Sequence, residues 1–253
     1  MVSLKTPQEI AKMRNAGRVV NTVLKRMGEM VRPGITTGEL EDAAATLISE
    51  HGGISPFLGY APPGHPPFPA WTCISVNDEI VHGIPGRRVL QEGDIVTVDC
   101  GVELDGWIAD SAWTYGVGKI SPQAERLLRV TREALYKGIE QARLGKFVGD
   151  IGYAVQKHAE SNGYSVVREL TGHGVGRTLH EGLQIPNYGM PGRKERLQCG
   201  MTFAIEPMIN AGRKDIKYRE DRWTIVTADG KLSAHFEHTV AIGPDGAQIL
   251  TGE

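Results

Sequence analysis

The chain has 253 residues, of which 40% are hydrophobic and 23% charged, and its formal net charge is −2. This length suits one domain built from two halves, and the balanced charge gives no indication of a surface for nucleic acid or anionic membrane. We expect no signal peptide and no membrane span, because the first residues are polar and no apolar run approaches eighteen residues. The three cysteines lack CxxC spacing, which indicates reduced thiols and predicts a cytoplasmic protein.

Two helices are expected at the start of the chain. Thr6 and Glu9 form a capping box, and the helix that they open ends at Arg32-Pro33-Gly34. Thr36 and Glu39 form a second box, whose helix ends at Gly52-Gly53. The first third of the protein is therefore predicted to begin with a helical pair.

A second helical pair is expected in the middle of the chain. Ser121-Pro122 opens a helix that Arg143-Leu144-Gly145 interrupts, and another helix runs from about Asp150 to Gly163. A displacement of 111 residues aligns Gly34 with Gly145 and repeats the caps and breaks of the first pair. We infer an internal duplication within a single domain over residues 1–253, with halves at about 1–117 and 118–253.

Each half then becomes rich in strands. Apolar or alternating runs bounded by turn residues predict strands at 72–84, 94–102, 107–115, 165–172, 201–209, 223–230 and 235–243. The proline-rich segment 60–70 is expected to be a loop with His65 in solvent, and the basic stretch 213–222 is expected to be a solvated face. The order of elements predicts an α+β fold of two duplicated halves.

Two aspartates, Asp99 and Asp110, stand in apolar runs on either side of Asp105-Gly106. A two-residue turn there pairs Leu104 with Trp107 and places both aspartates on one face of a hairpin, with Cβ atoms roughly 7–8 Å apart. Carboxylates this close repel one another unless a cation neutralises them. The spacing does not fit a calcium-binding EF-hand loop. Taken alone, the pair fits either a metal site or polar groups satisfied by the hairpin backbone.

The second half contains two more carboxylates, Glu206 and Glu237, each within an apolar strand-like run. Four such residues, two in each half, indicate a metal site. His173 and His180 lie in the glycine-rich stretch GHGVGRTLHEG, which matches neither a dinucleotide nor a phosphate loop. His82 closes a strand just before a glycine turn, where its side chain can face a cleft.

Five motifs in this order complete the pattern: CISVNDEIVHGIP, VTVDCGVELDGWIAD, TGHGVGRTLHE, TFAIEPM and SAHFEHT. Together they closely resemble type I (bacterial-type) methionine aminopeptidases, and the resemblance covers essentially the whole chain. It implies the pita-bread fold, in which a curved, mainly antiparallel sheet is covered by helices. It also implies a hydrolase that removes the N-terminal methionine from nascent proteins and peptides, preferably when the second residue is small.

The same resemblance implies a centre of two divalent metal ions, and Co, Mn, Fe, Ni and Zn all remain open. Its ligands would be Asp99, Asp110, His173, Glu206 and Glu237. Asp110 and Glu237 would bridge the ions, Asp99 would chelate one, and His173 with Glu206 would hold the other.

The resemblance further implies roles in the reaction. Glu206 would move a proton from the attacking water to the leaving amine, while His82 and His180 would contact the substrate amide and the scissile carbonyl. The pocket for the methionine side chain is implied at Phe57, Tyr60, Phe68, Cys73, Leu179 and Trp223, with Met208 nearby. Leu179 replaces an aromatic residue of many relatives, and the 61–70 segment is longer than in the commonest bacterial form.

Two alternatives remain open. Aminopeptidase P and prolidase enzymes use similar ligands, although they usually carry a large extra N-terminal domain. A metal-free binding protein could retain the fold, but such proteins lose ligands. Only 25 residues separate His180 from Glu206, which leaves no room for the insertion of type II enzymes. The expected partners are nascent polypeptide N-termini, near the ribosome, with no specific nucleic acid and no membrane, and the expected state is a monomer.

Overall fold

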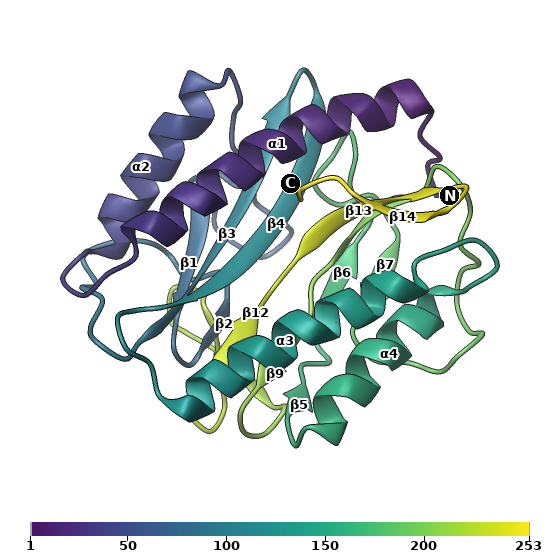
Figure 1. Ribbon diagram of the computed structural model, residues 1–253. Helices are drawn as coiled ribbons and strands as arrows, with labels where there is room; N and C mark the ends of the chain where they lie inside the picture. The colour runs from purple at the N-terminus through teal and green to yellow at the C-terminus, as the bar shows by residue number, and fades with distance from the viewer. Residues whose placement is uncertain (1, 253) are drawn as a thin grey trace.

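The computed structural model describes residues 2–252 and opens with the expected helical pair (Figure 1). Helix α1 (Pro7–Met30) begins at a complete capping box, in which Thr6 and Glu9 each accept a hydrogen bond from the other's backbone N–H. Helix α2 (Thr37–Glu50) begins in the same way at Thr36 and Glu39. Both predicted helices are confirmed, because their caps are local interactions within four residues.

The second pair consists of α3 (Pro122–Gln141) and α4 (Val148–Ser161). Helix α4 begins two residues earlier than the sequence predicts. The carboxylate of Asp150 accepts the Phe147 N–H at 2.7 Å and so satisfies a free donor of the first turn. The prediction is thus correct for the helix and wrong only for its first residues.

Within residues 2–252 the chain forms fourteen strands, of which β1 to β4 lie between the two helical pairs and β5 to β14 follow the second pair. They are β1 (Thr72–Val76), β2 (Glu79–Val81), β3 (Ile95–Leu104), β4 (Trp107–Gly116), β5 (Ser165–Val166), β6 (Thr171–His173), β7 (Gln184–Pro186), β8 (Thr202–Ile205), β9 (Met208–Asn210), β10 (Ile216–Tyr218), β11 (Ile225–Thr227), β12 (Ser233–His235), β13 (His238–Gly243) and β14 (Gly246–Ile249). All pairings between these strands are antiparallel. Several of the long predicted runs are divided into two strands by turns and breaks.

The β3–β4 hairpin has the predicted register. Leu104 pairs with Trp107, and Asp99 lies opposite Ala112. Asp105 and Gly106 both have positive φ, 52° and 73°, which is the backbone of the two-residue turn that matches the strand twist. The two-residue turn is therefore confirmed, and with it the prediction that both aspartates lie on one face of the hairpin.

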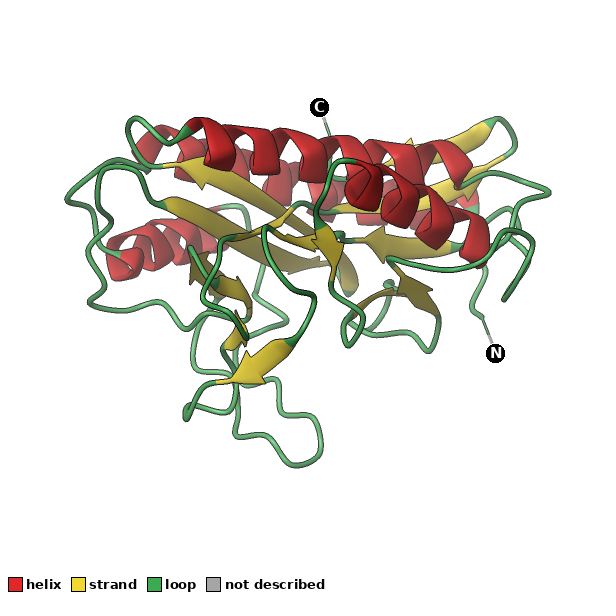
Figure 2. Cartoon of the chain, turned by 90° about the horizontal axis from the view of Figure 1, so that it is seen from below, coloured by secondary structure: helices red, strands yellow, loops and turns green. Residues whose placement is uncertain are grey.

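The helices form a layer on one side of the strands, and long loops extend from the other side (Figure 2). In Figure 1, α1 crosses β3 and β4 while α3 crosses the strands of the second half. One apolar cluster joins α1 and α2 to β1, β3 and β4, and another joins α3 and α4 to β8, β9 and β13. No helix within residues 2–252 has the length and apolar character needed to cross a lipid bilayer.

The two halves meet along β4. The Asp110 N–H donates to Thr239 Oγ1 at 2.9 Å, and the Thr239 hydroxyl donates to the Asp110 carbonyl at 2.8 Å. The Glu237 N–H donates to the carbonyl of Ala112 at 2.9 Å. These bonds fix a carboxylate of the first half beside one of the second half.

The sequence places Glu206 and Glu237 inside continuous strands, and this detail is wrong. Glu206 lies in the break between β8 and β9, and Glu237 lies in the break between β12 and β13. The pairs Ile205–His238 and Met208–His235 bracket the two breaks, so the glutamates lie opposite one another. The chain changes sheet at this point, since β8 pairs with β13 and β9 pairs with β12. Interruption of the ladder leaves both glutamates at one site.

Candidate functional site

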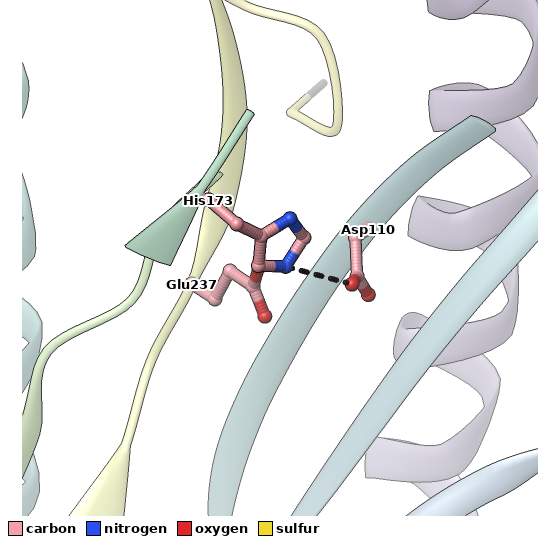
Figure 3. Close-up of side chains that lie close together, drawn as sticks. All are labelled: Asp110, His173 and Glu237. Atoms are coloured by element: carbon pink, nitrogen blue, oxygen red, sulfur yellow. Dashed lines mark ion pairs between the residues drawn. The ribbon is translucent and has the colours of Figure 1, made fainter. Parts of the chain in front are cut away.

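Three side chains from distant parts of the chain converge at the meeting of the halves (Figure 3). Ligand atoms of Asp110, His173 and Glu237 all lie within 4.8 Å of one another. His173 Nε2 is 3.7 Å from Asp110 Oδ2 and 3.6 Å from Glu206 Oε1. These separations are too long for hydrogen bonds, but two ligands each about 2.1 Å from a shared ion can lie this far apart.

Four carboxylates meet at this point: Asp110 and Glu237 are buried, and Asp99 and Glu206 are partly buried beside them. Burial raises the pKa of Asp110 to about 7. Burial, reinforced by the charge of Asp110, raises the pKa of Asp99, Glu206 and Glu237 well above the usual range. Negative charges are therefore costly here without a cation.

The hydrogen bonding of these carboxylates is incomplete. Within residues 2–252, Asp99 Oδ1, Asp110 Oδ1 and Glu237 Oε1 are buried without a hydrogen-bond partner. Buried acceptors without donors are rare in folded proteins, because no hydrogen bond compensates for the loss of their contact with water. Divalent cations would satisfy these oxygens, so the donor set fits a metal centre.

His173 is suited to be the nitrogen ligand of such a centre. Burial lowers its pKa to about 3, so the imidazole is neutral near pH 7. Its Nδ1 lies 3.2 Å from the carbonyl of Gly174, and a carbonyl only accepts, so Nδ1 carries the proton. The lone pair is therefore on Nε2, which faces Asp110 and Glu206.

The two other predicted histidines lie at the same cavity. Burial lowers the pKa of His82 to about 4 and also lowers the pKa of His180. His82 follows β2 directly and has a positive φ of 58°, a strained conformation that is typical of functional sites in non-glycine residues. His180 lies edge-to-face against His173, with 4.2 Å between ring centroids.

Tyr60 holds the ring of His180. Its hydroxyl lies 2.8 Å from His180 Nδ1, and burial raises the pKa of the phenol, which stays protonated near neutral pH. A tyrosine that donates to Nδ1 leaves the proton of the neutral imidazole on Nε2. In that tautomer, His180 can donate a hydrogen bond from Nε2.

A cavity of about 280 Å³ opens beside the carboxylates. Every residue predicted for the metal centre and for the substrate pocket lines it: Phe57, Tyr60, Phe68, Cys73, His82, Asp99, Asp110, His173, Leu179, His180, Glu206, Trp223 and Glu237. Met208 lines it as well. Phe68 packs edge-to-face on Trp223, with 5.2 Å between ring centroids, and the two rings give this part of the cavity lining an apolar surface.

The structure also adds residues that the sequence did not indicate. His65 was expected in solvent, but it lines the cavity, 5.1 Å from the Trp223 ring, and its Nδ1 is 2.9 Å from the carbonyl of Arg222. Tyr218 lines the cavity from the stretch that was expected to be a solvated face. Neither could be found from the sequence, because both reach the site through contacts between distant segments.

The loop that carries His180 is tied to the start of the chain. Lys5 forms an ion pair with Glu181, and only 3% of the Lys5 side chain is exposed. The Lys5 N–H donates to Gly200, and the other oxygen of Glu181 accepts the Arg177 N–H at 2.8 Å. These contacts restrain the loop directly beside His180.

Residues 11–244 match metallopeptidase family M24. A methionine aminopeptidase of Clostridium perfringens is 50% identical over 251 residues, which cover 99% of this chain and 99% of that protein. The crystal structure of methionine aminopeptidase from Rickettsia prowazekii has a TM-score of 0.96 at 43% identity and covers 100% of both chains. These similarities confirm the pita-bread fold that the motifs imply.

A prolidase from Pyrococcus furiosus is a more distant structural neighbour. Its TM-score is 0.78 at 22% identity, and the match covers 99% of this chain but 65% of the prolidase. At this identity the likeness shows a shared fold alone.

Proposed function

We propose that this chain, which belongs to metallopeptidase family M24 and within it to the methionine aminopeptidases, removes the N-terminal methionine from proteins and peptides. The observation that supports this proposal most strongly is a group of four carboxylates and one neutral histidine, buried or partly buried, which lines a cavity of about 280 Å³ together with apolar side chains. The charged side of this cavity suits a metal-assisted hydrolysis, and the apolar side suits a methionine side chain.

In this proposal, Asp99, Asp110, His173, Glu206 and Glu237 hold two divalent ions. Two such ions lower the pKa of a shared water toward neutrality. The predominance of oxygen donors suits Mn, Fe or Co as well as Zn and Ni, so the donor set does not select one metal.

Three residues of the chain act on the substrate in the proposed reaction. Glu206 accepts the proton of the attacking water and transfers it to the leaving nitrogen. His180 donates from Nε2 to the oxygen of the scissile carbonyl, where negative charge develops. His82 lies near the leaving amide, and its low pKa keeps it neutral during the reaction.

The apolar wall is proposed to select the first residue of the substrate. Phe57, Phe68 and Trp223 are each at most 7% exposed, and Cys73 is 5% exposed, so they offer an apolar, sulfur-tolerant surface. Leu179, also 7% exposed, contributes a branched aliphatic side chain where many relatives have a ring.

Further parts of the proposal concern the setting of the enzyme. It acts as a cytoplasmic monomer, near the ribosome, on newly made chains. The site supports a monomer because all of the proposed metal and substrate residues belong to one chain.

The test is peptide cleavage by protein loaded in turn with Co, Mn, Fe, Ni or Zn. Met-Ala-Ser should release methionine, whereas Leu-Ala-Ser, matched in all but the first residue, should be cleaved far more slowly. Absence of methionine release with every metal would refute the proposal and favour a metal-free binding protein. Preferential cleavage of Xaa-Pro peptides would instead favour a prolidase.

A further inference from the structure

One buried histidine at the metal centre belongs to none of the roles described above. His235 ends strand β12 and is 1% exposed. Neither Nδ1 nor Nε2 has a hydrogen-bond partner within residues 2–252. A neutral imidazole always carries one N–H donor, and leaving that donor unpaired in the interior costs about 1–3 kcal/mol. The N–H of the His235 imidazole therefore requires a hydrogen-bond acceptor within the functional site.

The main chain prevents the ring from moving away. His235 pairs with Met208 in the β12–β9 ladder. The hydroxyl of Thr114 donates to the His235 carbonyl at 2.6 Å, and the His235 N–H donates to the Thr114 hydroxyl oxygen at 3.1 Å. These contacts tie His235 to both β9 and β4, so its ring stays directed at the break that holds the two glutamates.

The polar atoms that the ring approaches are two carboxylate oxygens. His235 Nε2 lies 3.7 Å from Glu237 Oε2 and 4.0 Å from Glu206 Oε2. The other oxygen of Glu206, Oε1, lies 3.6 Å from His173 Nε2. Glu206 is thus placed between two neutral histidines, one of which offers a lone pair and the other an N–H.

We propose that His235 is a positioning residue of the metal centre, whose Nε2–H donates to the carboxylates of Glu237 and Glu206 and orients their remaining oxygens toward the metal. The inference rests on the proposed metal centre and adds a residue to it. A shift of a few tenths of an ångström brings the Glu237 contact into hydrogen-bonding range. Groups that orient metal ligands in this way typically change metal affinity by about 10–100-fold when they are removed.

The test compares His235→Gln with His235→Leu in the full-length protein. Glutamine keeps an N–H donor of similar reach, whereas leucine keeps the bulk and removes the donor. Binding of Co²⁺ to metal-free protein is measured by calorimetry, and the visible absorption of bound Co²⁺ reports its coordination. His51→Leu, which removes an exposed imidazole at the end of α2, is the matched control for non-specific binding.

We expect His235→Leu to weaken Co²⁺ binding about 10–100-fold and to alter the absorption, while His235→Gln and His51→Leu stay within a few-fold of wild type. If the leucine variant fails to fold, His235→Asn replaces it, because the shorter amide cannot reach the glutamates and should bind weakly. Wild-type affinity and absorption in the leucine or asparagine variant would overturn the inference. Equal loss in the glutamine and leucine variants would also overturn it, since imidazole itself would then be required. Wild-type protein that binds no Co²⁺ would instead refute the metal centre.

Discussion

The contact between Tyr60 and His180 gives the sharpest prediction for the proposed reaction. Tyr60→Phe removes one hydroxyl, and the ring that packs beside Trp223 and His180 remains. The variant therefore loses the hydrogen bond of 2.8 Å to His180 Nδ1 without opening the pocket. We expect the proton of the imidazole to distribute between its two nitrogens, so that Nε2 donates to the substrate carbonyl only part of the time.

The magnitude follows from the value of a single neutral hydrogen bond. Such a bond contributes about 0.5–1.5 kcal/mol, which corresponds to a decrease of roughly 2–10-fold in kcat. KM should change little, because the methionine side chain still meets the same apolar wall. Removal of the donor itself, in His180→Ala, should cost about 2.7–4 kcal/mol, or roughly 10²–10³-fold in kcat.

A double-mutant cycle tests this reasoning on Met-Ala-Ser. If Tyr60 acts through His180, Tyr60→Phe should have no further effect on kcat in the His180→Ala background. An equal loss from Tyr60→Phe in both backgrounds would refute a role through His180. An effect confined to KM would show that the hydroxyl contacts the substrate.

Three further predictions follow from the site. Asp99→Asn removes one charged chelating group, so metal analysis should find one bound ion in place of two, and methionine release should be abolished. An unchanged metal content would contradict the assignment of Asp99 as a ligand. As the pH rises from about 5 to about 7, metal-free protein should lose stability, because folded Asp110, whose pKa is raised from 3.8 to about 7, still holds a proton that the unfolded chain has already released; the raised pKa of Glu237 acts in the same direction. Metal at 100 times its dissociation constant should raise the free energy of unfolding by about 2.7 kcal/mol, which corresponds to roughly 5–10 °C in Tm. Equal Tm values of the metal-free protein at the two pH limits would refute this account. Lys5→Met leaves the partly buried Glu181 without its cation and should cost up to about 3 kcal/mol in thermal unfolding. Stability should partly recover when Glu181→Gln is added, and additive losses in the double variant would contradict the pairing.

Local signals in the sequence were sufficient for the helices and for one hairpin. The capping boxes at Thr6 and Thr36 act over three residues, and their helices begin where predicted. The Asp105-Gly106 turn determines the β3–β4 register, because a two-residue loop permits only one parity. The common face of Asp99 and Asp110 was therefore accessible from the chain alone.

The motifs directed attention to residues that are far apart in the sequence and that line one cavity in the structure. Asp99 and Asp110 by themselves fitted polar groups satisfied by the backbone equally well. Glu206 and Glu237 in the second half favoured a metal site, and the resemblance to a known family implied a ligand set that also includes His173; all five residues line one cavity. Their detailed placement differs, since the glutamates occupy breaks between strands.

Sequence by itself determined where the helices begin, how the first hairpin is paired and which residue types are available for metal chemistry, because these depend on neighbours a few positions apart. Only the tertiary structure decided that Glu206 faces Glu237 across a break in the ladder, that Tyr60 orients His180, and that His65 lines the cavity. The same is true of the unpaired imidazole of His235. Each of these features depends on segments that are distant in the chain, so no local sequence pattern contains it.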